Sequence, residues 1–152
     1  MTNIRLIQHA PGAPGLRLLG LGPNLVPNRG LRKLKCLFDS NAFWASDRKL
    51  STIRRILAGS SVVVSLWRRE RMVGFGRATS DGISRAVLWD IVIANDLQGN
   101  GLGRKVVEAL VNSHQLINAD RIYLMTTYRS EFYEQLGFKK VVDQSLLMLD
   151  RK

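Results

Sequence analysis

The sequence predicts a single α/β domain in which a mixed central β-sheet is flanked by helices. The chain has 152 residues, which is the size of one domain with a sizeable hydrophobic core. After residue 30, apolar segments with the character of strands alternate with segments whose apolar residues recur at i, i+3 and i+4. All four prolines and five of the 13 glycines lie in residues 11–30, which sets this segment apart from the rest. We therefore expect a domain over residues 31–152, preceded by a partly irregular segment over residues 1–30.

Each expected helix or strand follows from a local feature of the sequence. In the N-terminal segment the density of Pro and Gly argues against helix, and one strand is expected near Leu16–Leu21. Leu31 and Leu34 begin the first helical pattern, and a second helix is expected over residues 49–58 with Asp47 as its N-cap. Beyond these, strands are expected over residues 60–68, 71–81, 84–96, 121–127 and 139–149, and helices over 101–114 and 130–136. The strand 84–96 is apolar almost throughout, so we expect it in the interior of the sheet.

Composition limits the possible functions. The net charge is +11, and residues 1–71 hold 13 Lys and Arg against 3 Asp and Glu. Such a basic half would attract the phosphates of a cofactor, a nucleic acid or an anionic membrane, and charge alone does not choose among them. The single cysteine, Cys36, excludes an internal disulfide, and with only His9 and His114 beside it no metal centre is expected. The sequence has no run of 18 apolar residues that would predict a membrane-spanning helix.

The stretch "LQGNGLGRKV", residues 97–106, places three glycines directly before a predicted helix. Bare backbone at the start of a helix lets main-chain N–H groups approach an anionic ligand. Two familiar glycine loops are excluded by spacing, because the sixth position counted from Gly99 is Arg104 rather than glycine.

These residues resemble a known family. Gln98, Gly101 and Gly103 match the signature [Q/R]-x-x-G-x-[G/A] of the GCN5-related N-acetyltransferases, the GNAT family. The block "FYEQLGFKKV", residues 132–141, is similar to the C-terminal F-Y-x-x-x-G-F motif of that family. The resemblance covers roughly residues 45–150. Within the family, the chain most resembles the cyanobacterial and plastid branch, which includes serotonin (arylalkylamine) N-acetyltransferases and relatives that acetylate proteins. Asn95 departs from the pattern, since a proline often follows the central strand.

The resemblance implies the GNAT fold, acetyl-CoA as cosubstrate and no metal. It implies that the main chain of one strand aligns the pantetheine arm and that the glycine loop holds the pyrophosphate. The cofactor-binding residues implied in this way are Ile91, Val92, Ile93, Gln98, Gly99, Asn100, Gly101, Leu102, Gly103, Arg104 and Lys105.

Tyr133 is the candidate general acid. The resemblance implies that it lies near the thioester sulfur, and a phenol with a pKa of about 10 is reasonably matched to a leaving thiol of about 8.5. The alternative is that Tyr133, like Phe132, is a core aromatic.

Asp90 is the candidate base for the incoming amine. It interrupts the apolar run "VLWDIVI", on the same side as Leu88 and Val92. Burial in a strand is expected to raise its pKa, which would suit proton abstraction. The alternative is a structural ion pair with Arg85 or Arg77.

An aromatic pocket would select the acceptor. Aromatic residues that could line it are Phe43, Trp44, Phe75, Trp89 and Tyr128. We expect acetyl transfer to a small arylalkylamine such as serotonin or tryptamine, by direct attack in a ternary complex. One alternative is acetylation of protein lysines or N-termini, and a second is a basic nucleic-acid-binding module.

We expect no nucleic-acid or membrane partner, a monomer or homodimer, and a location in the bacterial (cyanobacterial) cytoplasm or in a plastid.

Overall fold

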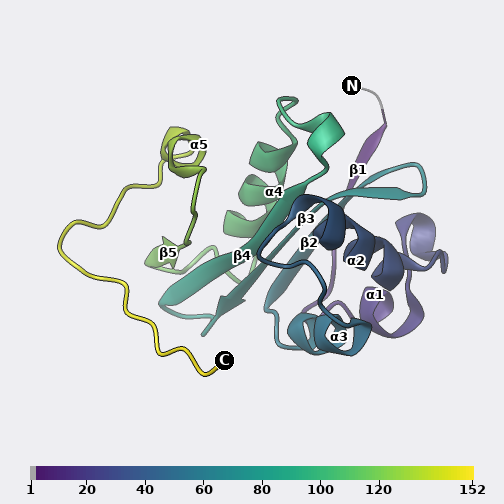
Figure 1. The fold of residues 1–152 in the computed structure, drawn as a ribbon, viewed down its shortest axis with the longest axis horizontal. Coiled ribbons are helices and arrows are strands. Elements are labelled where there is room, and N and C mark those ends of the chain that lie inside the picture. Colours follow the sequence, from purple (N-terminus) through teal and green to yellow (C-terminus); the bar gives the residue numbers. More distant parts are fainter. Residues whose placement is uncertain (1–2) are drawn as a thin grey trace.

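The computed structural model describes residues 3–152, which form one five-stranded mixed sheet with helices on both faces (Figure 1). The strands lie in the order β1-β2-β3-β4-β5. They are β1 (Ile4–Gln8), β2 (Val62–Arg68), β3 (Arg71–Ser80), β4 (Arg85–Ile93) and β5 (Arg121–Tyr123). The helices are α1 (Pro14–Leu19), α2 (Gly30–Asn41), α3 (Leu50–Ala58), α4 (Leu102–Val111) and α5 (Ser130–Gln135), with short 3-10 turns η1 (Pro23–Leu25) and η2 (Asn95–Leu97).

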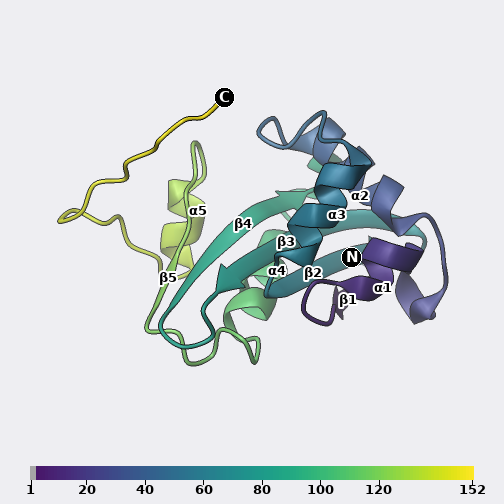
Figure 2. The same ribbon diagram turned by 90° about the horizontal axis from the view of Figure 1, so that it is seen from below.

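The sheet lies between two helical layers (Figure 2). Helices α2 and α3 cover one face and α4 covers the other, as the alternation along β3 shows. Phe75 packs edge-on against Phe38 of α2, with ring centroids 5.4 Å apart. The next residue, Gly76, faces α4 so closely that a Cβ there would lie 2.5 Å from Val106 Cγ1. The fold class expected from the sequence is confirmed.

The N-terminal segment is more regular than expected. β1 pairs antiparallel with β2, and Leu16 is fully buried in the core. The strand expected near Leu16–Leu21 is wrong, because Pro14 begins α1 and Gly20, with φ of 63°, ends it. Pro14 and Pro23 therefore start helical turns instead of preventing them.

The C-terminal part is less regular than expected. β5 pairs with β4 over three residues only, and the strand expected over residues 139–149 does not form. This segment loops outward beyond α5 before its end turns back (Figure 1), leaving Val142 95% and Leu147 89% exposed, while Leu146 lines the cleft of the candidate site. A strand exists only through pairing with a neighbour, so apolar composition alone did not determine its state.

Helix α3 begins without the expected cap. Its N-cap residue is Lys49, with no side-chain hydrogen bond. Asp47 instead donates its backbone N–H to Asp39 Oδ1 at 2.8 Å. Among residues 3–152, no helix is long and apolar enough to cross a membrane.

A β-bulge in β4 positions the site. Trp89 pairs with Arg77 and Val92 with Phe75, so Asp90 and Ile91 together lie opposite the single residue between them on β3. Asp90 adopts a left-handed φ of 54°, which is uncommon for a residue with a side chain. Because of the bulge, the Asp90 side chain faces the α2–α3 layer. The main chain after Asp90 runs along a cleft.

Candidate active site

A cleft of about 1100 Å³ lies along the C-terminal half of β4. Its walls are the glycine loop at the start of α4, the segment after α2, the segment after β5, and α5. Ile91, Val92 and Ile93 line it. The three elements that the sequence motifs mark thus meet at one cleft.

The glycine loop forms one wall through its backbone. Gly99 and Gly101 have φ of 82° and 77°, and a Cβ at either position would meet no atom within 4 Å. Gly101 is also the N-cap of α4, and no side chain caps the helix there. The first N–H groups of a helix have no intrahelical acceptor, so this wall presents donors and the positive end of the helix dipole.

Gly103 has a different task from the other two glycines. A Cβ there would lie 3.0 Å from Cζ of Phe132, on α5. Its missing side chain allows α5 to approach the start of α4. The two sequence motifs are therefore in direct contact.

Not all of the predicted cofactor residues line the cleft. Gln98, Leu102 and the three loop glycines do. Within the described chain, Asn100, Arg104 and Lys105 lie outside its wall. Asn100 donates to the Leu97 carbonyl at 3.0 Å and so holds the turn, and Arg104 pairs with Glu108 at 2.7 Å. Arg129, which the sequence reading missed, lines the cleft and donates to Gln98 Oε1 at 3.0 Å.

Tyr133 lies in the cleft wall on α5. Its ring contacts Phe132 and Phe138, with centroid distances of 4.9 and 5.9 Å. Burial raises the pKa of Tyr133 to about 12, because the phenolate is poorly solvated there. This corrects the expected value near 10 and keeps the phenol protonated at any physiological pH.

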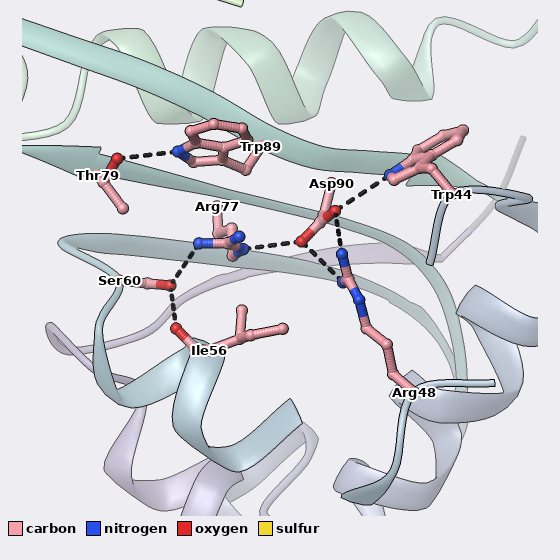
Figure 3. Close-up of polar contacts among 8 residues, drawn as sticks. All are labelled: Trp44, Arg48, Ile56, Ser60, Arg77, Thr79, Trp89 and Asp90. Atoms are coloured by element: carbon pink, nitrogen blue, oxygen red, sulfur yellow. Dashed lines mark hydrogen bonds and ion pairs between the residues drawn. The ribbon is translucent and has the colours of Figure 1, made fainter. Parts of the chain in front are cut away.

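Asp90 accepts four hydrogen bonds from three side chains (Figure 3). Its Oδ2 accepts from Arg77 Nε at 2.8 Å and from Arg48 Nη1 at 3.0 Å. Its Oδ1 accepts from Arg48 Nη2 at 3.2 Å and from Trp44 Nε1 at 3.1 Å. The side chain is only 4% exposed. The ion-pair alternative is therefore what the structure shows, with Arg77 as one partner.

The expected rise in the pKa of Asp90 is wrong. Burial alone would raise the pKa, but the hydrogen bonds and charges of Arg48 and Arg77 outweigh it and leave the pKa below its usual value. The other proposed partner, Arg85, lies instead 3.9 Å from Asp120.

Arg48 is a second residue, after Arg129, that the sequence did not indicate. It lies 42 positions before Asp90, its guanidinium stacks 5.3 Å from the Phe38 ring centroid, and it binds the carboxylate in bidentate fashion. Arg77 reaches a second element, because its Nη1 donates to Ser60 Oγ at 3.4 Å and Ser60 donates to the Ile56 carbonyl of α3 at 2.8 Å. No spacing in the sequence indicates either contact.

Aromatic side chains line the cleft opposite the glycine loop. Phe43 contacts Trp44 and Tyr128, with ring centroids 5.2 and 6.1 Å away. Trp89 also lines the cleft and donates from Nε1 to Thr79 Oγ1 at 2.9 Å (Figure 3). Phe75 does not belong to this group, because it is fully buried against Phe38 on the far side of the bulge. Its assignment as a substrate residue is wrong.

The cleft carries little free charge. Among the described residues that line it, Asp90 is the acidic side chain and Arg129 the basic one, and Asp90 is neutralised by two guanidinium groups. Within residues 3–152 no group of three or more His, Cys, Asp or Glu side chains is placed to hold a metal ion.

The chain has recognisable relatives. The family model described as an acetyltransferase (GNAT) domain matches residues 59–140. An uncharacterized N-acetyltransferase, ycf52, of Pyropia yezoensis is 36% identical over 76% of this chain and 68% of its own length. The chloroplastic serotonin N-acetyltransferase 2 of Oryza sativa subsp. japonica is 38% identical over 60% of this chain and 48% of its own. The histone acetyltransferase TAP1 of Glycine max is 32% identical over 60% and 45%.

A solved structure shares the fold. It is a GNAT family acetyltransferase from Streptococcus pneumoniae, with a TM-score of 0.72 and 15% identity over 98% of this chain and 99% of that one. The matched family model spans β2 to α5, which includes the bulge, the glycine loop and the Tyr133 helix. The chain belongs to the GNAT family and is an acetyltransferase.

Proposed function

We propose that this enzyme transfers an acetyl group from acetyl-CoA to the primary amine of a small arylalkylamine such as serotonin or tryptamine. The observation that carries the proposal is one cleft in which an uncapped helix N-terminus, Tyr133 and an aromatic wall face the same space. The rice relative, named a chloroplastic serotonin N-acetyltransferase, supports both this acceptor class and a plastid location.

The residues present fit acetyl-CoA. Gly99 and Gly101 leave open space where a Cβ would otherwise project, and the N–H groups at the start of α4 are suited to a pyrophosphate. Arg129, in place of the expected Arg104 and Lys105, is the cation on the cleft wall that can reach the phosphates. Ile91, Val92 and Ile93 offer main-chain groups to the pantetheine arm.

Tyr133 serves as the general acid in this proposal. Acetyl-CoA supplies a thioester, whose acetyl carbon is attacked by the amine nitrogen as the carbon–sulfur bond breaks. The attacking nitrogen loses one proton to solvent as the amide forms. The departing sulfur takes the proton of Tyr133 Oη, and Tyr133 then recovers one from solvent. With its pKa raised to about 12, Tyr133 carries its proton at the working pH, and the gap to the leaving thiol of about 8.5 is wider than the match expected for a phenol of about 10.

Asp90 is not the base in this proposal. Both of its oxygens accept hydrogen bonds from cations, and its lowered pKa makes it a weak proton acceptor. The amine reacts in its uncharged form, drawn from solution into a cleft without free carboxylate. Aromatic packing, rather than an ammonium–carboxylate pair, then provides the acceptor's affinity.

Protein lysine acetylation is the second candidate. The relative in Glycine max is named a histone acetyltransferase, and the cleft is open at its aromatic side, where Tyr128 is 82% exposed. A lysine side chain lacks the ring that the aromatic wall would contact, so we place the arylalkylamine first.

Steady-state turnover with acetyl-CoA across tryptamine, serotonin, a polyamine and a lysine peptide tests the proposal. The highest kcat/KM is expected for tryptamine or serotonin. A lysine peptide that exceeds every small amine tenfold would contradict the acceptor class and leave acetyl transfer intact.

A further inference from the structure

The Asp90 carboxylate joins parts of the molecule that are distant in sequence. It lies on the bulge of β4, and its partners come from β3 (Arg77) and from the segment 42–49 between α2 and α3 (Trp44 and Arg48). Figure 3 shows these side chains converging on the two carboxylate oxygens. The residue that shapes the cofactor strand therefore also fixes the segment that carries Phe43 and Trp44.

Other contacts hold the backbone of the segment 42–49: Ala42 and Ala45 are buried, Asp47 donates its N–H to Asp39 Oδ1 at 2.8 Å, and Lys35 Nζ donates to the Arg48 carbonyl at 2.9 Å. None of these contacts involves the two aromatic side chains of the segment. Phe43 and Trp44 are 66% and 49% exposed, so burial alone does not fix them. Arg48, by contrast, is 21% exposed and makes a two-pronged pair with Asp90. A planar guanidinium that binds both carboxylate oxygens fixes direction as well as distance.

We propose that Arg48 is a positioning residue that sets acceptor selection by holding the segment 42–49, through Asp90, so that the Trp44 indole forms the acceptor wall. This rests on the proposed function, because it assigns the aromatic side of the cleft to the amine. Arg48 acts through Asp90 and Trp44 and touches neither substrate. The acceptor favoured by this wall is an amine with a planar aromatic group.

The consequence is a selective kinetic effect. Loss of the Arg48 pair would free the Trp44 wall but leave the glycine loop, which is built by separate contacts, in place. Acceptor KM should rise while acetyl-CoA KM stays unchanged. A merely structural ion pair would instead lower stability and weaken both substrates alike.

Arg48→Met removes the charge and keeps an aliphatic stem over Phe38, and Arg48→Lys keeps a charge without the bidentate geometry. A matched control is Arg71→Met, because Arg71 makes a bidentate pair with Asp96 at 2.7 and 2.8 Å and neither residue lines the described cleft. We expect R48M to lower kcat/KM for tryptamine about tenfold through KM, R48K to recover part of the loss, and R71M to match the wild type.

Two further measurements separate positioning from folding. Acrylamide quenching of tryptophan emission should increase in R48M and not in R71M, since the Asp90 carboxylate that accepts from Trp44 Nε1 is then held by Arg77 alone. In a double-mutant cycle, Arg48→Met and Trp44→Phe should be strongly non-additive in acceptor kcat/KM, because both release the same wall.

Additive effects, unchanged quenching, or equal changes in the KM of both substrates would overturn the positioning role. Absence of acetyl transfer to every amine in the wild type would instead overturn the proposed function, and the quenching result would still test the anchor itself.

Discussion

The ring of Phe132 lies against Gly103, at a distance where a Cβ on residue 103 would come within 3.0 Å of Cζ. Gly103 belongs to the glycine loop and Phe132 to α5, next to Tyr133. The geometry of the glycine loop and the position of the proposed acid are therefore coupled through one close contact.

Gly103→Ala should test this coupling. Alanine favours helix by about 1 kcal/mol over glycine, so without the contact the variant would be more stable. Because Phe132 must move, we expect kcat to fall roughly 3- to 10-fold as Tyr133 shifts with it. The control is Gly59→Ala, where the nearest atom to a new Cβ is 3.7 Å away. An unchanged kcat together with a higher Tm would show that the contact is not functional.

Tyr133→Phe removes the phenolic proton and keeps the ring. We expect kcat to fall by about 100-fold, the lower range for loss of general-acid catalysis, with acetyl-CoA KM unchanged. Tyr123→Phe, on β5 outside the described cleft wall, should retain wild-type kcat. With the Tyr133 pKa at about 12, the wild-type pH–rate profile should show no loss from this group below about pH 11. Near-normal kcat in Y133F would show that Tyr133 is a core aromatic residue and not the general acid.

His9 should make stability depend on pH. Burial lowers its pKa from 6.5 to about 4, and Ser65, which accepts from Trp67 Nε1, lies 2.8 Å from His9 Nε2. Above pH 6.5 both folded and unfolded states hold it neutral, so its contribution is fully present there. As the pH falls from 6.5 to 4, the unfolded state binds a proton that the folded state refuses, and up to about 3 kcal/mol is lost.

Urea unfolding of wild type and His9→Gln at pH 7.5 and 4.5 measures this term. The wild type should lose more free energy of unfolding than H9Q between the two values. Equal losses would show that His9 is not kept neutral by burial.

The glycine loop could be predicted from the sequence because its backbone conformation depends on neighbouring residues in the chain. Gly99 and Gly101 need left-handed φ, and a helix follows at once, so the pattern survives without any knowledge of the fold. The role of Gly103 could not be read this way, since its neighbour Phe132 comes from another helix.

Asp90 shows the opposite case. Its presence in an apolar strand was visible, but the sign of its pKa shift depends on Arg48 and Arg77, which only tertiary packing brings to it. Phe75 was misassigned for a related reason: its ring is buried against Phe38 of α2, a contact that only tertiary packing makes. The prediction of a strand over residues 139–149 was wrong because pairing with a neighbouring strand, and not composition, determines whether a strand forms.

The most direct test of the account is a calorimetric titration of acetyl-CoA into Gly101→Val and Gly82→Val. Both glycines have nearly the same φ, 77° and 76°, and open space beyond a new Cβ, but only Gly101 lines the described cleft. Backbone strain should therefore lower Tm similarly in both. We predict that G101V loses at least about tenfold in acetyl-CoA affinity, because its branched side chain enters the pyrophosphate wall, while G82V binds like the wild type. Equal affinity in a folded G101V would contradict the placement of acetyl-CoA on this loop.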